Sequence, residues 1–134
     1  MPIDPVKQAE ELAQIFFGLS NATDDFRLHN FNALSTARQQ QLKEQAQALD
    51  TRGQQCTADA LGAILQGIQP HLANIKQATK DAQDALARLN DVVKGLAIVD
   101  AAVALVGSIM AGDIGSIADN VQNLFEAISP TEKD

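Results

Sequence analysis

The side chains that could do chemistry are few in this sequence, and they lie far apart. The chain contains two histidines, His29 and His71, and a single cysteine, Cys56. Metal and acid–base sites need several such groups to converge, and neither histidine stands with a carboxylate in the helical spacing of a di-iron site. A lone cysteine forms no intramolecular disulfide, and a reactive one needs a nearby base or cation. We therefore predict no enzyme and no catalytic, cofactor-binding or metal-binding residues.

The charged residues match the pattern of solvated helix surfaces. Asp84 and Arg88, for example, are four residues apart and can pair on one helix face. The net charge of −7 is divided almost evenly between the two halves of the chain. Without a basic patch such a chain is a poor partner for nucleic acid, because phosphate neutralisation supplies most of that binding. We expect no nucleic-acid partner, and the same charge disfavours anionic membrane surfaces.

The elements that would position these groups are helices, and the strongest pattern is a heptad stripe in the middle of the chain. Large aliphatic residues recur there alternately four and three positions apart, which predicts one long helix over about 57–96. The flanking positions lack the opposed charge pairs of a two-stranded coiled coil, so we expect two or more neighbouring helices around it. The stripe, which we predict to be core or an interaction surface, comprises Leu61, Leu65, Ile68, Leu72, Ile75, Leu86, Leu89, Val93 and Leu96.

The rest of the chain predicts further helices and no strands. Asp4 and Thr57 match helix N-caps, Gly18 matches a helix end, and Ser116 with Asp119 resembles a capping box. We predict an all-α protein that forms a single domain over 1–134. Its architecture is an elongated bundle of four to five helices around the long one. The predicted helices cover about 5–18, 24–52, 57–90 with continuation or a restart to 111, and 116–128, followed by a frayed tail at 130–134.

Two places decide whether the long helix is continuous. Pro70 lies inside the register of the stripe, where a proline costs ~3 kcal/mol and kinks a helix. Because the register persists through it, we predict a kinked continuous helix, and a break stopped by Gly67 is the alternative. Further on, the helix either changes neighbours near Gly95 or ends and restarts around 90–91. A single helix over 57–111 would be about 80 Å long, too long for its short partners, so we prefer the break, with dimerisation.

One stretch is unusually apolar for a soluble helix. From Gly95 to Gly112 the chain carries a single charge, Asp100, and small residues recur four apart, which lets helices approach closely. The stretch is either the surrounded central helix of the bundle or a concealed segment that inserts into membranes. The uncharged run after Asp100 is shorter than the roughly 20 residues that cross a bilayer. The residues that define this possible membrane or tight-packing segment are Val99, Val103, Val106, Ser108 and Met110.

Two functional hypotheses follow. The first is a non-enzymatic helical-bundle protein that acts through protein–protein interaction or self-assembly, as a homo-oligomer with a dimer preferred. The alternative is a membrane-active or lipid-binding protein that uses residues 95–112. In that case the chain, a soluble helical body that carries one apolar helical stretch, resembles α-helical pore-forming toxins. The resemblance is one of architecture alone. The N-terminus has no basic region followed by an apolar run, so we expect a cytoplasmic protein, with signal-independent export as an alternative.

Overall fold

The computed structural model describes residues 4–89 and 91–129, and all regular secondary structure in these two ranges is helical. This confirms the predicted all-α class, and no strand occurs within those two ranges. The elements in chain order are α1 (Pro5–His29), η1 (Phe31–Ala33), α2 (Thr36–Gln54), α3 (Ala58–Leu61), α4 (Ile64–Ile68), η2 (Gln69–His71), α5 (Leu72–Arg88), α6 (Val92–Ala111) and α7 (Ile114–Ile128).

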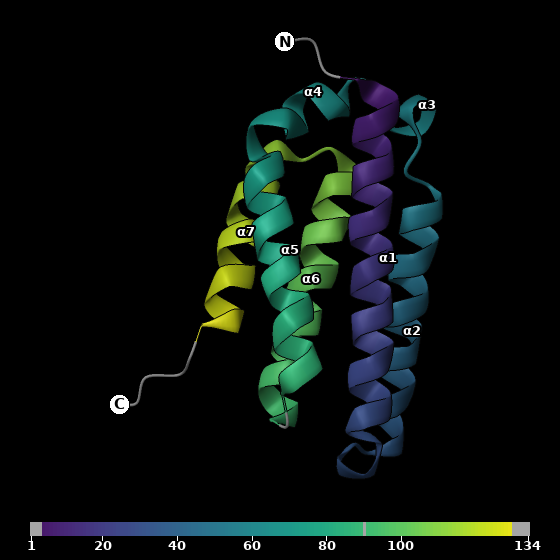
Figure 1. Cartoon of the computed structure of the whole chain (residues 1–134), viewed down its shortest axis with the longest axis vertical. Helices are drawn as coiled ribbons and strands as arrows, with labels where there is room; N and C mark the ends of the chain where they lie inside the picture. Colours follow the sequence, from purple (N-terminus) through teal and green to yellow (C-terminus); the bar gives the residue numbers. More distant parts are fainter. Residues whose placement is uncertain (1–3, 90, 130–134) are drawn as a thin grey trace.

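The longer helices lie side by side along the long axis of the molecule (Figure 1). Helices α1 and α5 pack against each other and form one layer. Helix α6 packs between α2 and α7 and forms the second layer with them, while α1 and α5 cover its inner side. The short helices α3 and α4 join α2 to α5 across one end of this bundle (Figure 1). Helix α6 is therefore the middle member of a three-helix layer.

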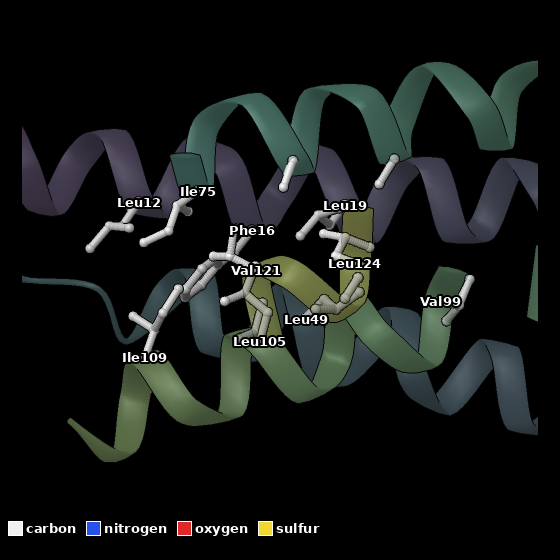
Figure 2. Packing of buried hydrophobic residues seen from close by; sticks show 14 of the residues in the cluster. Leu12, Phe16, Leu19, Leu49, Ile75, Val99, Leu105, Ile109, Val121 and Leu124 are labelled. Atoms are coloured by element: carbon white, nitrogen blue, oxygen red, sulfur yellow. The ribbon is translucent and has the colours of Figure 1, made fainter. Parts of the chain in front are cut away.

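The core lies between the two layers. Figure 2 shows Phe16 of α1, Leu49 of α2 and Leu105 of α6 directed toward one another, with Val121 of α7 beside them. All of these side chains are buried, and burial of each large aliphatic group contributes about 1.5–3 kcal/mol. Because every long helix contributes to the same cluster, the core holds α6 on its inner side.

Two predicted N-caps are confirmed. The Asp4 carboxylate accepts hydrogen bonds from the backbone N–H groups of Val6 and Lys7, and the Thr57 hydroxyl accepts one from Ala60. The predicted capping box at Ser116 is wrong, because α7 begins two residues earlier, with Asp113 as its N-cap. The backbone N–H of Ser116 donates to that carboxylate at 3.2 Å.

The N-terminal helix is longer than predicted. It was expected to end at Gly18, but α1 continues to His29, so residues 24–29 belong to it and not to the next helix. Helix α2 instead begins at Thr36, after the N-cap Ser35, and ends at Gln54. Gly18 does not end a helix. It permits close packing between α1 and α5, because a Cβ at this position would lie 2.8 Å from Gln83 Nε2 of α5.

The predicted long helix over 57–96 is broken in the structure. Gly62 has a positive φ of 53°, which separates α3 from α4, and Pro70 lies in the 3-10 turn η2, so the kinked continuous helix is wrong. Gly67 lies within α4 and does not stop it. The alternative restart near 90–91 is confirmed, because α5 ends at Arg88 and α6 follows the N-cap Asp91. Residue 90 and the predicted frayed tail at 130–134 lie outside the described residues.

Candidate interaction surface

The groups that could do chemistry do not converge. His29 is exposed at the end of α1, and His71 is half-buried in η2. The Cys56 thiol is buried, its sulfur lies 4.0 Å from the Met110 sulfur, and burial raises its pKa to about 11. Such a thiol stays protonated and is a poor nucleophile near neutral pH. Within residues 4–89 and 91–129, no three side chains of His, Cys, Asp or Glu form a group that could hold a metal ion.

A polar groove lies between α1 and α2. It has a volume of about 630 Å³ and includes Ser20, Asp24, Arg27 and Lys43 in its lining. Arg27 Nη2 and Asp24 Oδ1 are 2.7 Å apart, so these two charges neutralise each other. The Ser20 hydroxyl donates to the Ala46 carbonyl at 2.7 Å and is likewise occupied within the chain. The remaining charged residues of the lining, Lys43 and Asp50, have opposite signs, so the groove does not select one ligand charge.

The heptad stripe does not form one continuous surface. Its members Leu61, Leu65, Ile68, Ile75 and Leu86 are buried, and Leu72, Leu89 and Leu96 are half-buried. Val93, by contrast, is 78% exposed, so it is not part of the core, and its prediction as part of an interaction surface stays a prediction. The chain reverses direction between α5 and α6, so the second helix presents a different face to the core. Residues that share a heptad register in the sequence therefore do not lie on one surface when the chain reverses direction between them.

The apolar stretch 95–112 corresponds to most of α6 and has an inward and an outward face. Val99, Val106 and Ser108 are buried, whereas Val103 and Met110 are half-buried. Gly95 is also buried, and a Cβ there would collide with the Phe26 ring of α1. The inward face is therefore core, as the bundle hypothesis expects.

The outward face of α6 is the largest departure from an ordinary bundle surface. We define it by its exposed residues, which recur four and three positions apart and so lie on one side of the helix. Val93 is the most exposed large hydrophobic residue of the described chain. A Cβ built at Gly107 would meet no atom within 4 Å, so the space above this residue is open. The outward face comprises Val93, Ala97, Asp100, Ala104, Gly107 and Ala111, flanked by the half-buried Leu96, Val103 and Met110.

Polar contacts hold the two edges of this face. Gln45 Nε2 of α2 donates to Asp100 Oδ1 at 2.8 Å, and Asn120 Nδ2 of α7 donates to the Ala104 carbonyl at 3.2 Å. The Lys94 ammonium, which lies on the flank of the outward face, donates to the carbonyls of Ala127 and Ser129 at the end of α7. The charge of Lys94 is thus engaged within the chain. Asp100 is the one charge among the residues that define the outward face.

Sequence reasoning found the apolar stretch but not its outward face. The signal was present in the spacing of alanine and glycine, yet the same residues suit a helix surrounded on all sides. Their exposure depends on the opposite directions of α5 and α6, which leave α6 at the surface of one layer (Figure 1). No protein-family model, curated protein or solved structure matches this chain.

Proposed function

We propose that this chain is a non-enzymatic helical-bundle protein that acts by binding another protein chain through the outward face of α6. The observation that carries the proposal is the composition of that face. A surface helix of a globular protein normally turns charged and polar residues to water. Here the exposed positions are Val93, three alanines and Gly107, with Asp100 as the exception. Contiguous exposed apolar surface rimmed by polar residues is typical of interaction sites.

Gly107 supports this proposal independently of hydrophobicity. A glycine inside a helix costs about 0.8–1 kcal/mol relative to alanine, so it is favoured only where a side chain would obstruct packing. Gly95 on the inward face meets that condition, because the Phe26 ring occupies the space a side chain would need. Among the described residues, no atom of another part of the chain lies within 4 Å of where a Cβ at Gly107 would be. A partner helix that approaches closely at Gly107 would account for the missing side chain.

Site-specific photo-cross-linking tests the proposal. A photoreactive residue replaces Gly107, where the open space accommodates it, and in a control protein it replaces Ala87, an exposed alanine of α5. We expect protein adducts from position 107 and none from position 87, in purified protein or in extract of the source cells. Equal adducts from both positions, or none from position 107, would contradict the proposal.

A second candidate, membrane or lipid binding, rests on the length of α6. Among the described residues, α6 is the helix long and apolar enough to cross a membrane by length and composition alone. Its 20 residues span about 30 Å, the thickness of the hydrocarbon core. A buried core helix has the same properties, and α6 would have to leave Phe26 and the rest of the core to insert.

Liposome flotation separates the two candidates. The purified protein is mixed with neutral and with anionic liposomes at pH 7 and pH 5, alongside the Val103→Lys and Gly107→Lys variants. Membrane insertion predicts flotation of the wild type, stronger at pH 5 than at pH 7 because the chain then carries less net negative charge, and its loss in both variants. Recovery of all three proteins in the unbound fraction would leave protein binding as the function. Lipid adducts from the photoreactive residue at position 107 would favour the membrane instead.

A further inference from the structure

We infer that the partner of the outward face is a second copy of this chain, packed with the two α6 helices antiparallel. This inference rests on the proposed function and adds the identity and the orientation of the partner. Three features of the described residues carry it: the symmetry of the outward face, the position of its one charge, and the area of the layer around it.

The outward face is complementary to itself in the antiparallel orientation. Its residues are placed symmetrically about position 102, so a two-fold axis there aligns the full length of both helices. Such an axis makes an isologous interface, in which each contact occurs twice. Every resulting pair contains an alanine or a glycine, which allows the two backbones to approach closely. The pairs are Val93 with Ala111, Ala97 with Gly107, and Asp100 with Ala104.

The charge on the face selects this orientation. In a parallel dimer the two Asp100 carboxylates would meet at the same level, where like charges in an apolar contact repel. In the antiparallel dimer they lie about 6 Å apart along the axis, and each faces an alanine. Each carboxylate also keeps its own hydrogen bond from Gln45 at 2.8 Å. Antiparallel helices in addition align their dipoles favourably.

The surface area of the three-helix layer around α6 is large enough for a stable dimer. The outward face alone, about 30 Å by 10 Å, offers about 300 Å² per copy, which is less than a specific interface needs. However, α6 is the middle helix of the α2–α6–α7 layer, with a neighbour packed on each side (Figure 1). Helices packed 8–10 Å apart make this layer about 25 Å wide. Two such layers in contact bury about 1,500 Å² in total, the area of a standard interface, with polar side chains of α2 and α7 as its rim.

Disulfide cross-linking between two variants that each add one exposed cysteine to the buried native Cys56 tests the orientation. An antiparallel dimer places Val93 of one copy against Ala111 of the other, whereas the two copies of Val93 lie about 27 Å apart along the axis. A disulfide needs Cα atoms within about 7 Å. Under mild oxidation we expect covalent dimer from a mixture of the Val93→Cys and Ala111→Cys proteins, and monomer from either protein alone. The wild type is the matched control, because Cys56 is buried.

Two results would overturn the antiparallel orientation. Cross-linking of the Val93→Cys protein with itself would show a parallel dimer. Absence of covalent dimer in every sample, with monomer mass at all concentrations in analytical ultracentrifugation, would show that the chain does not self-associate.

The Gly107→Leu variant tests the close approach itself. Leucine fits the open space within one chain but would hold a second helix away. We expect an unchanged helical circular dichroism spectrum and a dimer Kd raised at least about tenfold, measured by analytical ultracentrifugation. An unchanged Kd would overturn the inference.

The photo-cross-linking experiment distinguishes failure of this inference from failure of the proposed function. Adducts of position 107 with a different protein, from a chain that is itself monomeric, would overturn the inference and leave the proposed function intact. A monomeric chain without protein adducts would contradict both.

Discussion

The two faces of α6 are both largely apolar, but they have very different surroundings. The inward face carries Val99, Leu105 and Ile109, which are fully buried against the other helices (Figure 2). The outward face carries alanines, Gly107 and Val93, which is 78% exposed. The helix is therefore apolar all round without being surrounded in the folded chain. A hydropathy average over the helix cannot separate the two faces, because both are largely apolar and the exposure of each residue depends on the packing around it.

The two glycines of α6 also differ in their surroundings: Gly95 lies on the packed inward face and Gly107 on the open outward face. Gly95 leaves room for the Phe26 ring, so its missing side chain is explained inside the chain. At Gly107, by contrast, the described residues place no atom within 4 Å of where a Cβ would lie, so no internal packing explains the missing side chain. The comparison teaches that a helix glycine indicates close packing, and that the structure then shows whether the packing partner is internal.

The largest contrast is expected from aspartate substitutions at two members of the heptad stripe. Leu86→Asp places a carboxylate at a side chain that is only 2% exposed, and burying an unpaired charge should cost more than about 4 kcal/mol. Val93→Asp changes a residue that is 78% exposed and should alter the free energy of unfolding by about 0.5 kcal/mol or less. Urea unfolding followed by circular dichroism, at low protein concentration, measures both.

Association provides the complementary readout for this pair. Val93→Asp should weaken self-association while the fold persists, because it adds a charge to the proposed contact. Similar destabilisation by Leu86→Asp and Val93→Asp would mean that Val93 is part of the core, and the distinction between the faces would fail.

The second contrast compares alanine at the two glycines. Gly95→Ala adds a methyl group where the Phe26 ring lies, and overpacking of this kind should destabilise the fold by about 1–3 kcal/mol. Gly107→Ala adds the same group in open space and should stabilise the monomer by up to about 1 kcal/mol through helix propensity. Thermal unfolding of both variants checks the opposite signs. If both changes stabilise the protein, Phe26 can move away, and the inward glycine has no packing role.

The sequence predicted the class and the local signals of this fold well. The Asp4 and Thr57 caps were predicted because capping depends on a side chain and backbone groups two or three residues away. The buried half of the heptad stripe, such as Ile68 and Ile75, was predicted because spacing alone determines a helix face. These features depend on neighbours in sequence, so no knowledge of the packing was needed.

The errors concern features that depend on distant residues. Gly18 matched a helix end, but its actual role is to admit Gln83 from another helix. Pro70 was placed in a continuous helix because the register persisted, although the chain turns at Gly62 and at η2. The outward face of α6 was missed for the same reason, since the pattern cannot show where the chain reverses and leaves a helix uncovered.

A smaller effect is expected at Cys56, which contacts Met110 on the flank of the outward face. Burial raises the pKa of its thiol from 9.0 to about 11 in the folded state. The unfolded chain therefore loses this proton first as the pH rises, and the stability that the buried thiol contributes below pH 9 declines toward pH 11. The difference in unfolding free energy between the wild type and Cys56→Ala should shrink over this range. A constant difference, or rapid alkylation of the folded protein at pH 8, would show that this flank is open.

The smallest effect is expected at Asp113, the N-cap of α7, which forms one edge of the three-helix layer. The Ser116 hydroxyl donates to Asp113 Oδ2 at 2.8 Å and the Ser116 backbone N–H donates to Oδ1, and these hydrogen bonds lower the pKa of the carboxyl group below 3.8. Its contribution is therefore present above pH 3.8 and is lost as the pH falls through the lowered folded-state pKa. The urea midpoints of wild type and Asp113→Ala should differ at pH 6 and converge at low pH, whereas Asp119→Ala, an exposed position of the same helix, should show no such convergence. If both variants show the same pH dependence of the urea midpoint, the Asp113 cap does not stabilise the first turn of α7. The outward face would then be bordered by a helix whose first turn unfolds without a loss of stability.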